Sequence, residues 1–108
     1  FKIERAFFVK GNKGSTRGDH AHYKCCQFLI CLNGIIEVYC DNGNTEKKYI
    51  LNNFNKGLLI PPLVWAKQYY QSENSLLAVI CDMKYKESDY INNYDIFKEK
   101  VYDDENFN

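Results

Sequence analysis

The stretch GSTRGDHAHYKCCQFLICLNG, residues 14–34, decides the fold of this chain. It carries two histidines separated by one residue, His20 and His22, and then an apolar run that ends at Asn33-Gly34. Asn-Gly tolerates the positive φ angles of a tight β-hairpin. Residues i and i+2 of a strand point to the same face, so we expect both imidazoles on one side of a sheet. The stretch therefore predicts paired strands with two histidines on a shared face.

Short apolar runs continue this pattern along most of the chain, interrupted by turn residues. The expected strands cover residues 1–10, 27–32, 35–40, 46–51, 57–60, 63–70 and 75–85. Short strands with a turn about every 8–12 residues are typical of a β-sandwich or barrel. We therefore expect an all-β domain that occupies residues 1–108.

The C-terminal region changes to a helical period. Apolar residues recur there at steps of three and four, namely Tyr90, Ile91, Tyr94, Phe97 and Val101. This spacing predicts an amphipathic helix from Ser88 onward, with one face packed on the barrel. Asp89 in its first turn would suit the positive end of the helix dipole.

Composition limits the class of partner. Hydrophobic residues make up 45% of the chain and aromatic residues 16%, which excludes a disordered protein. The 14 basic and 14 acidic residues balance, so we expect neither a nucleic acid nor a membrane as partner. The five cysteines are odd in number, and most lie in apolar runs. They are best interpreted as reduced core residues of a cytoplasmic protein.

Residues 14–34 resemble the first motif of the cupin superfamily, G-x5-H-x-H-x4-E-x6-G, in every spacing. Gln27 stands where that motif has its acidic residue. The second cupin motif, P-x-G-x-x-H, corresponds to PPLVWA at residues 61–66, so Ala66 stands in place of its histidine. The resemblance implies a cupin-type β-barrel, or jelly roll, with a short C-terminal α-helix.

The two departures from the cupin motifs argue against a bound metal. A cupin metal site uses two histidines and a glutamate from the first motif and one histidine from the second. Here Gln27 is a neutral, poor ligand and Ala66 supplies none, which leaves two ligands where three or four are usual. We therefore expect no bound metal and no cofactor, and the histidines are free for proton transfer.

Several local strings together suggest a narrower family. They are RGDHAHYK at 17–24, QFLICLNG at 27–34, GLLIPPLVW at 57–65 and DYINNYDIF at 89–97. They resemble the nucleotide-linked sugar 3,4-ketoisomerases, cupins that act on dTDP-4-keto-6-deoxyglucose in deoxysugar biosynthesis for lipopolysaccharide or other glycans. The resemblance implies a dTDP-linked sugar substrate, a homodimer and an additional segment ahead of Phe1.

The same resemblance places the family's active-site residues on this chain. Its histidine pair corresponds to His20 and His22, its arginine to Arg17, and the Trp after the double proline to Trp65. His20 is our preferred base for the C3 proton, with His22 orienting it or moving a proton between O3 and O4; the reverse order stays open. Arg17 would stabilise the enediolate or hold the diphosphate.

Strand alternation suggests further substrate-binding residues. Gln68 and Tyr70 share the alternation of Ala66 and are expected in the barrel lumen, as is Gln27. Trp65 points outward by the same count, so packing and a role at the mouth of the site remain alternatives. Two other functions also stay open: a sugar-nucleotide 3,5-epimerase, and a cupin that binds a ligand without catalysis.

Overall fold

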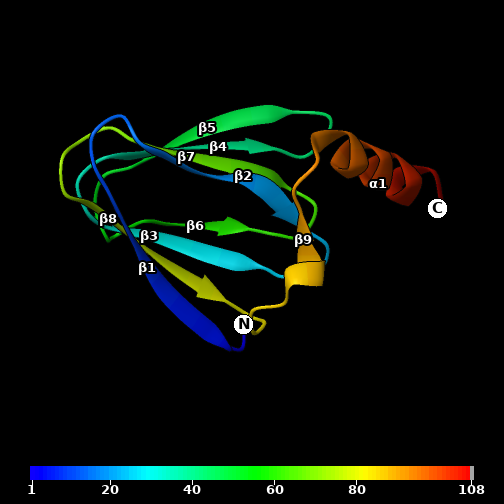
Figure 1. The fold of residues 1–108 in the computed structure, drawn as a ribbon, viewed down its shortest axis with the longest axis horizontal. Coiled ribbons are helices and arrows are strands. Elements are labelled where there is room, and N and C mark those ends of the chain that lie inside the picture. The colour runs from blue at the N-terminus through cyan, green and yellow to red at the C-terminus, as the bar shows by residue number, and fades with distance from the viewer. Residues whose placement is uncertain (108) are drawn as a thin grey trace.

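Two antiparallel β-sheets face each other in the computed structural model, which describes residues 1–107 (Figure 1). One sheet has the strand order β1-β8-β3-β6 and the other β5-β4-β7-β2-β9. The strands are β1 (Arg5–Gly11), β2 (Thr16–His22), β3 (Gln27–Asn33), β4 (Ile36–Asp41), β5 (Glu46–Leu51), β6 (Gly57–Ile60), β7 (Trp65–Tyr70), β8 (Ser75–Cys81) and β9 (Tyr90–Ile91). The predicted all-β cupin-type class is confirmed.

The core lies between the two sheets and follows the period-2 pattern of the strands. On β3, Leu29 and Cys31 are buried, while their neighbours are partly exposed on the other face. The chief members of the core are Leu29, Ile36, Val38, Tyr70, Leu77 and Val79. All five cysteines are free thiols, as expected for small core residues.

The hairpin predicted at Asn33-Gly34 is present between β3 and β4. Gly34 has φ of 87°, and a Cβ at this position would come within 2.6 Å of the Ser72 and Ser75 hydroxyl oxygens. The turn therefore needs glycine both for its backbone angle and for space.

The helix prediction was wrong at its start. The helix α1 runs over Tyr94–Phe107, and Glu87–Asp89 form a short 3-10 turn instead. Tyr90 and Ile91 form strand β9, which pairs with β2. Strand pairing with the edge of β2 satisfies the backbone of Tyr90 and Ile91, and this outweighs the helical preference of their apolar spacing. The helix begins after Asn93, whose Oδ1 accepts a hydrogen bond from the Ile96 amide at 3.1 Å, as an N-cap residue does.

A second apolar cluster attaches α1 to the outer face of the five-stranded sheet. It consists of Ala21, Trp65, Ile91, Phe97 and Val101. The Tyr94 hydroxyl adds a hydrogen bond to the buried Asp41 carboxylate. Among residues 1–107, no helix is both long and apolar enough to cross a membrane.

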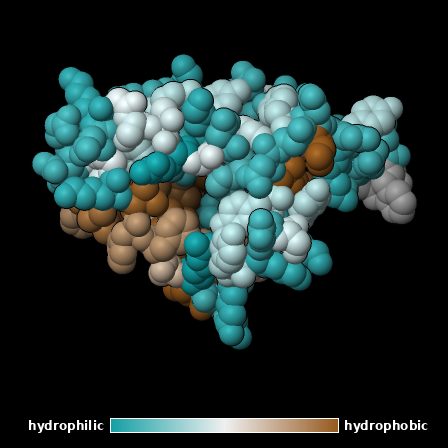
Figure 2. Space-filling view, in the orientation of Figure 1, coloured by the Kyte–Doolittle hydropathy of each residue, from teal (hydrophilic) through white to brown (hydrophobic). Residues whose placement is uncertain are grey.

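The outer face of the four-stranded sheet, by contrast, carries no helix in the described part of the chain (Figure 1). Phe8 is 66% exposed and Leu59 52% exposed there. Figure 2 shows hydrophobic surface gathered over the region of β1, β8 and β3. This apolar face, formed around Phe8, Phe28, Leu59 and Ile80, is a candidate contact surface.

Candidate active site

A β-bulge in β2 determines which side chains enter the barrel. The pairing of β2 with β7 shifts register between Gly18 and His20. Gly18 and Asp19 both have positive φ, 85° and 69°. The extra residue brings Arg17 and His20, three positions apart, to the same face, where both line one cavity. Simple alternation would have placed them on opposite faces.

Trp65 supports this bulge from the outer face of the sheet. Its Nε1 donates a hydrogen bond to Asp19 Oδ1 at 2.9 Å. The indole is 6% exposed and packs against Tyr94 and Phe97 of α1, with ring centroids 5.3 and 5.6 Å away. Of the two alternatives for Trp65, the structure therefore shows packing, because the residue lies behind the sheet rather than at the cavity.

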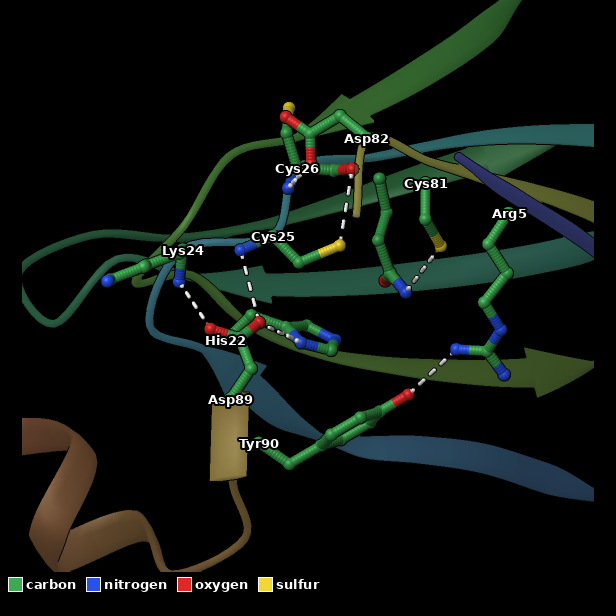
Figure 3. A network of polar contacts seen from close by, with 10 residues as sticks. Arg5, His22, Lys24, Cys25, Cys26, Cys81, Asp82, Asp89 and Tyr90 are labelled. Carbon is green, nitrogen blue, oxygen red and sulfur yellow. Dashed lines mark hydrogen bonds and ion pairs between the residues drawn. The ribbon is translucent and has the colours of Figure 1, made fainter. Parts of the chain in front are cut away.

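His22 is held by a buried carboxylate. Its Nδ1 lies 3.1 Å from Asp89 Oδ2, and both side chains are buried. The Asp89 carboxylate also accepts hydrogen bonds from the backbone amides of Lys24, at 2.8 Å, and Cys25, at 3.1 Å. The other ring nitrogen, Nε2, is buried without a hydrogen-bond partner. In Figure 3 it points away from Asp89, toward the side on which Arg5 lies.

His20 lies closer to the open space of the barrel. It is half-buried, and its ring meets that of His22 edge-on at a centroid distance of 5.1 Å. Tyr90 packs against both imidazoles at 5.0 and 4.4 Å. The Tyr90 hydroxyl in turn accepts a hydrogen bond from Arg5 at 3.2 Å (Figure 3).

Burial lowers the pKa of both imidazoles below the ordinary 6.5. For His20 the neighbouring His22 lowers the pKa further, while a hydrogen bond to the Gly18 backbone and the charge of Asp19 oppose this. For His22 the Asp89 carboxylate raises the pKa, against burial and the charge of Arg5. Both rings are therefore neutral near pH 7 and able to accept a proton.

A cavity of about 240 Å³ lies between the sheets beside His20. Its polar lining comprises Arg5, Arg17, His20, Gln27, Gln68 and Tyr90. The lining, as far as the described residues form it, contains no acidic side chain. The structure thus brings together the predicted His20, Arg17, Gln27 and Gln68 around one space, whose charged side chains are arginines.

Tyr70 lies in the core and outside the cavity lining. It is 1% exposed in the core and its hydroxyl donates to Gln68 Oε1 at 3.2 Å. Its ring also packs closely over Gly11, where an added Cβ would lie 2.4 Å from it. Tyr70 therefore supports Gln68 from behind and does not itself line the cavity.

Sequence reasoning missed three residues of this site: Arg5, Asp89 and Tyr90. Arg5 shares the inward period-2 face of β1 with Phe7, a signal that was present in the sequence. Asp89 and Tyr90 were assigned to a helix, and their place beside His22 depends on the pairing of β9 with β2. That pairing has no local sequence signal.

His22, Cys25 and Asp89 gather side-chain types that can bind metals, with ligand atoms within 4.8 Å of one another. Their contacts favour a different role. The Asp89 carboxylate already accepts two backbone amides and faces the His22 Nδ1. Burial raises the pKa of the Cys25 thiol to about 12, and a neutral thiol is a poor ligand. We therefore interpret the cluster as a hydrogen-bonded support for His22.

The family described as FdtA: WxcM-like, C-terminal, matches residues 1–102. The chain belongs to this family. A TDP-4-oxo-6-deoxy-alpha-D-glucose-3,4-oxoisomerase of Aneurinibacillus thermoaerophilus is 37% identical over 102 residues, which are 94% of this chain and 73% of that protein.

Solved structures of similar proteins superpose closely on this chain. QdtA, a sugar 3,4-ketoisomerase of Thermoanaerobacterium thermosaccharolyticum in complex with TDP, is 37% identical with a TM-score of 0.92, over 96% of this chain and 77% of its own. WlaRA, a TDP-fucose-3,4-ketoisomerase of Campylobacter jejuni, is 38% identical with a TM-score of 0.90, over 94% and 76%. The resemblance to sugar 3,4-ketoisomerases that the sequence suggested is confirmed at the level of the family.

Proposed function

We propose that this chain is a TDP-sugar 3,4-ketoisomerase that moves the keto group of TDP-4-keto-6-deoxyglucose from C4 to C3. The names of its relatives support the reaction and the substrate class. The observation that carries the proposal is the pair of contacting imidazoles beside a cavity lined by two arginines. An isomerisation through an enediolate needs both a base near neutral pKa and fixed positive charge.

The reaction requires two proton relocations. The C3–H bond breaks and C3 becomes the carbonyl carbon, while a C–H bond forms at C4; the O3 proton moves to O4. The electrons stay within the substrate, so no external oxidant or reductant takes part. His20 lines the cavity and would take the carbon-bound proton from C3 and return it to C4. His22 lies behind it and would serve the two oxygens.

Arg5 and Arg17 supply the charge that the enediolate requires. Both line the cavity, and the charge that develops on O4 as C3 loses its proton needs a fixed donor in a site shielded from water. A guanidinium is also suited to a diphosphate, so one arginine can serve the sugar and the other the phosphates. Gln27 and Gln68 are placed to donate hydrogen bonds to sugar hydroxyls.

The size of the cavity suggests how the substrate lies. About 240 Å³ is below the roughly 300–1,000 Å³ of a typical small-molecule site. The space therefore suits the sugar ring, and the nucleotide would extend past the mouth of the barrel.

Incubation with TDP-4-keto-6-deoxyglucose in D2O, followed by NMR, tests this function. We expect a 3-keto product, and a parallel reaction in H2O keeps hydrogen at C4, so the coupling between H4 and H5 identifies the configuration there. Retention of the 4-ketone with deuterium at C3 and C5 would instead identify a 3,5-epimerase. Recovery of the unchanged 4-keto sugar, with hydrogen still on C3 and C5, would identify a protein that only binds the sugar.

We also propose that the reaction needs no metal and takes place in the cytoplasm. Gln27 and Ala66 occupy the two positions where a metal-binding cupin would have its other ligands. The five free thiols suit a reducing compartment.

We further propose that the chain is a homodimer and that a second copy covers the apolar face around Phe8 and Leu59. An exposed apolar sheet face with a free edge at β1 needs such cover in water. Light scattering should find a dimer, and Phe8→Lys should shift it toward monomer. Tyr102→Lys, at a residue 65% exposed on α1, is the matched control and should remain dimeric. A monomeric wild-type protein would contradict the proposal.

A further inference from the structure

The buried Nε2 of His22 is the unexplained polar atom of this site. It is the one buried side-chain nitrogen or oxygen of the described residues that has no hydrogen-bond partner. Leaving such an atom unpaired in the interior of a protein destabilises the fold. A nitrogen that keeps its lone pair free can accept a proton.

The contacts of Asp89 determine which ring nitrogen carries the hydrogen. Its Oδ1 accepts from the Lys24 amide, and its Oδ2 accepts from the Cys25 amide. These two amides can only donate, so they orient and stabilise the carboxylate as an acceptor. His22 Nδ1, 3.1 Å from Oδ2, must then donate as well. The ring is thus held with hydrogen on Nδ1 and a lone pair on Nε2.

We propose that Asp89 is a positioning residue that fixes His22 in the Nδ1–H tautomer, so that Nε2 can accept the proton passing between O3 and O4. The catalytic half of this inference rests on the proposed function. In Figure 3, Asp89 holds one side of the imidazole, and the opposite nitrogen faces the side of the barrel on which Arg5 lies. Arg5 itself lines the cavity.

The ionisable groups around His22 support a neutral ring that can gain a proton transiently. Each neighbouring element contributes one group: His20 from β2, Cys25 from the loop after β2, Arg5 from β1, Asp89 from the 3-10 turn and Tyr90 from β9. The carboxylate of Asp89 favours the imidazolium, whereas Arg5 and burial oppose it. This balance suits a group that accepts a proton and returns it.

The wild-type protein provides the first test. Long-range ¹H–¹⁵N NMR distinguishes the two tautomers of a neutral imidazole directly. The chain has two histidines, so the spectrum of a His20→Asn variant assigns the His22 signals. We expect hydrogen on Nδ1 and an unprotonated Nε2 near pH 7.5. Hydrogen on Nε2 in the wild-type protein would overturn the inference.

The variant Asp89→Asn provides the second test. The neutral Asn amide has one oxygen for three donors, the Lys24 amide, the Cys25 amide and the His22 Nδ1–H, so it no longer fixes the His22 tautomer. We expect kcat to fall at least about tenfold, as when an orienting carboxylate is lost from a catalytic triad. The acid limb of the pH–rate profile should move to lower pH, because the group that raises the pKa of His22 is gone.

Asp82→Asn is the matched control. Asp82 also accepts a backbone amide, that of Cys26 at 2.8 Å, and it has no hydrogen bond to a histidine. We expect it to keep the tautomer, the kcat and the acid limb. Wild-type kcat in Asp89→Asn, or an equal kcat loss in both variants, would overturn the inference.

The two proposals fail in different ways. An inactive wild-type protein with hydrogen on Nδ1 would overturn the proposed function and the proton transfer, while supporting the contact made by Asp89. An active wild-type protein with hydrogen on Nε2 would overturn the role of Asp89 alone. Should Asp89→Asn not fold, the wild-type tautomer still decides the positioning contact.

Discussion

His20 and His22 lie two residues apart on one strand, yet the protein holds them by opposite means. His20 follows a bulge with two successive positive φ angles, is half-buried and lines the cavity. His22 lies in regular pairing with β9, is 6% exposed and is tied to Asp89. Backbone geometry orients the His20 ring, and a buried hydrogen bond orients the His22 ring.

The two histidines of the motif therefore have different requirements. The ring that lines the cavity needs access, and a bulge supplies it without enclosing the side chain. The ring that stands behind needs a defined tautomer, which a buried carboxylate enforces. Variants at the two sites should therefore affect different measurements.

The largest effect is expected for turnover in His20→Asn. Loss of a general base typically costs about 10²–10⁴ in kcat. The affinity for TDP-sugar, measured by calorimetry, should stay within about threefold because the arginines and glutamines of the cavity remain. Near wild-type turnover would remove His20 from the mechanism.

For stability, the larger effect of the two histidine variants is expected from His22→Asn. His22→Asn leaves the buried Asp89 carboxylate without its side-chain partner, so we expect a loss of about 1–3 kcal/mol in the free energy of unfolding. His20→Asn should cost less because His20 is half-exposed. Urea denaturation compares the two, and equal losses would contradict the distinction.

A smaller effect on both measurements is expected for Trp65→Phe. It removes the Nε1 hydrogen bond to Asp19 but keeps an aromatic ring against α1. We expect a loss of about 1 kcal/mol in stability and of about tenfold or less in kcat, because His20 is held less accurately.

Tyr94→Phe is the control for that variant. It removes the hydrogen bond to Asp41 from the same cluster without touching the bulge. Its stability should fall by a similar amount while its kcat stays unchanged. A kcat loss as large as that of Trp65→Phe would show that general loosening of α1, and not the bulge, is responsible.

Acidification should reduce stability through both rings. Their pKa values are lowered in the folded protein, so the unfolded chain binds more protons once the pH falls through 6.5. The stabilisation is fully present above that pH and declines from there toward the folded-state pKa values. The Tm should therefore fall between pH 7 and pH 5, and less steeply in His20→Asn. The same pH dependence in that variant would exclude His20 as a contributor.

The smallest expected effect is that of EDTA, which should leave the rate unchanged. Gln27 and Ala66 stand where a metal-binding cupin has its other two ligands, so only the two imidazoles would be left to hold a metal. Loss of activity on chelation, with recovery on adding Zn²⁺, would show that the two imidazoles bind a metal together and would contradict the metal-free mechanism.

The sequence predicted much of this architecture because its signals are local. The period-2 runs, the Asn33-Gly34 turn and the His20–His22 spacing each depend on neighbouring residues alone. Tyr90 and Ile91 were misassigned because their apolar spacing suits a helix, while the edge of β2 supplies strand pairing. The family resemblance predicts Arg17 as a site residue, whereas alternation without the bulge would not place it beside His20.

An all-β cupin-type domain, its family and the pair of histidines can be predicted from the amino-acid sequence alone, because strand period, turn residues and motif spacing are properties of short segments. The environment of the two histidines exists only in the folded protein. The tertiary structure places Asp89 against His22 and Arg5 near Tyr90 from segments far apart in the chain, and it places Trp65 behind the sheet. Burial and long-range hydrogen bonds set the tautomer and the pKa of an imidazole, and both exist only after the sheets have packed.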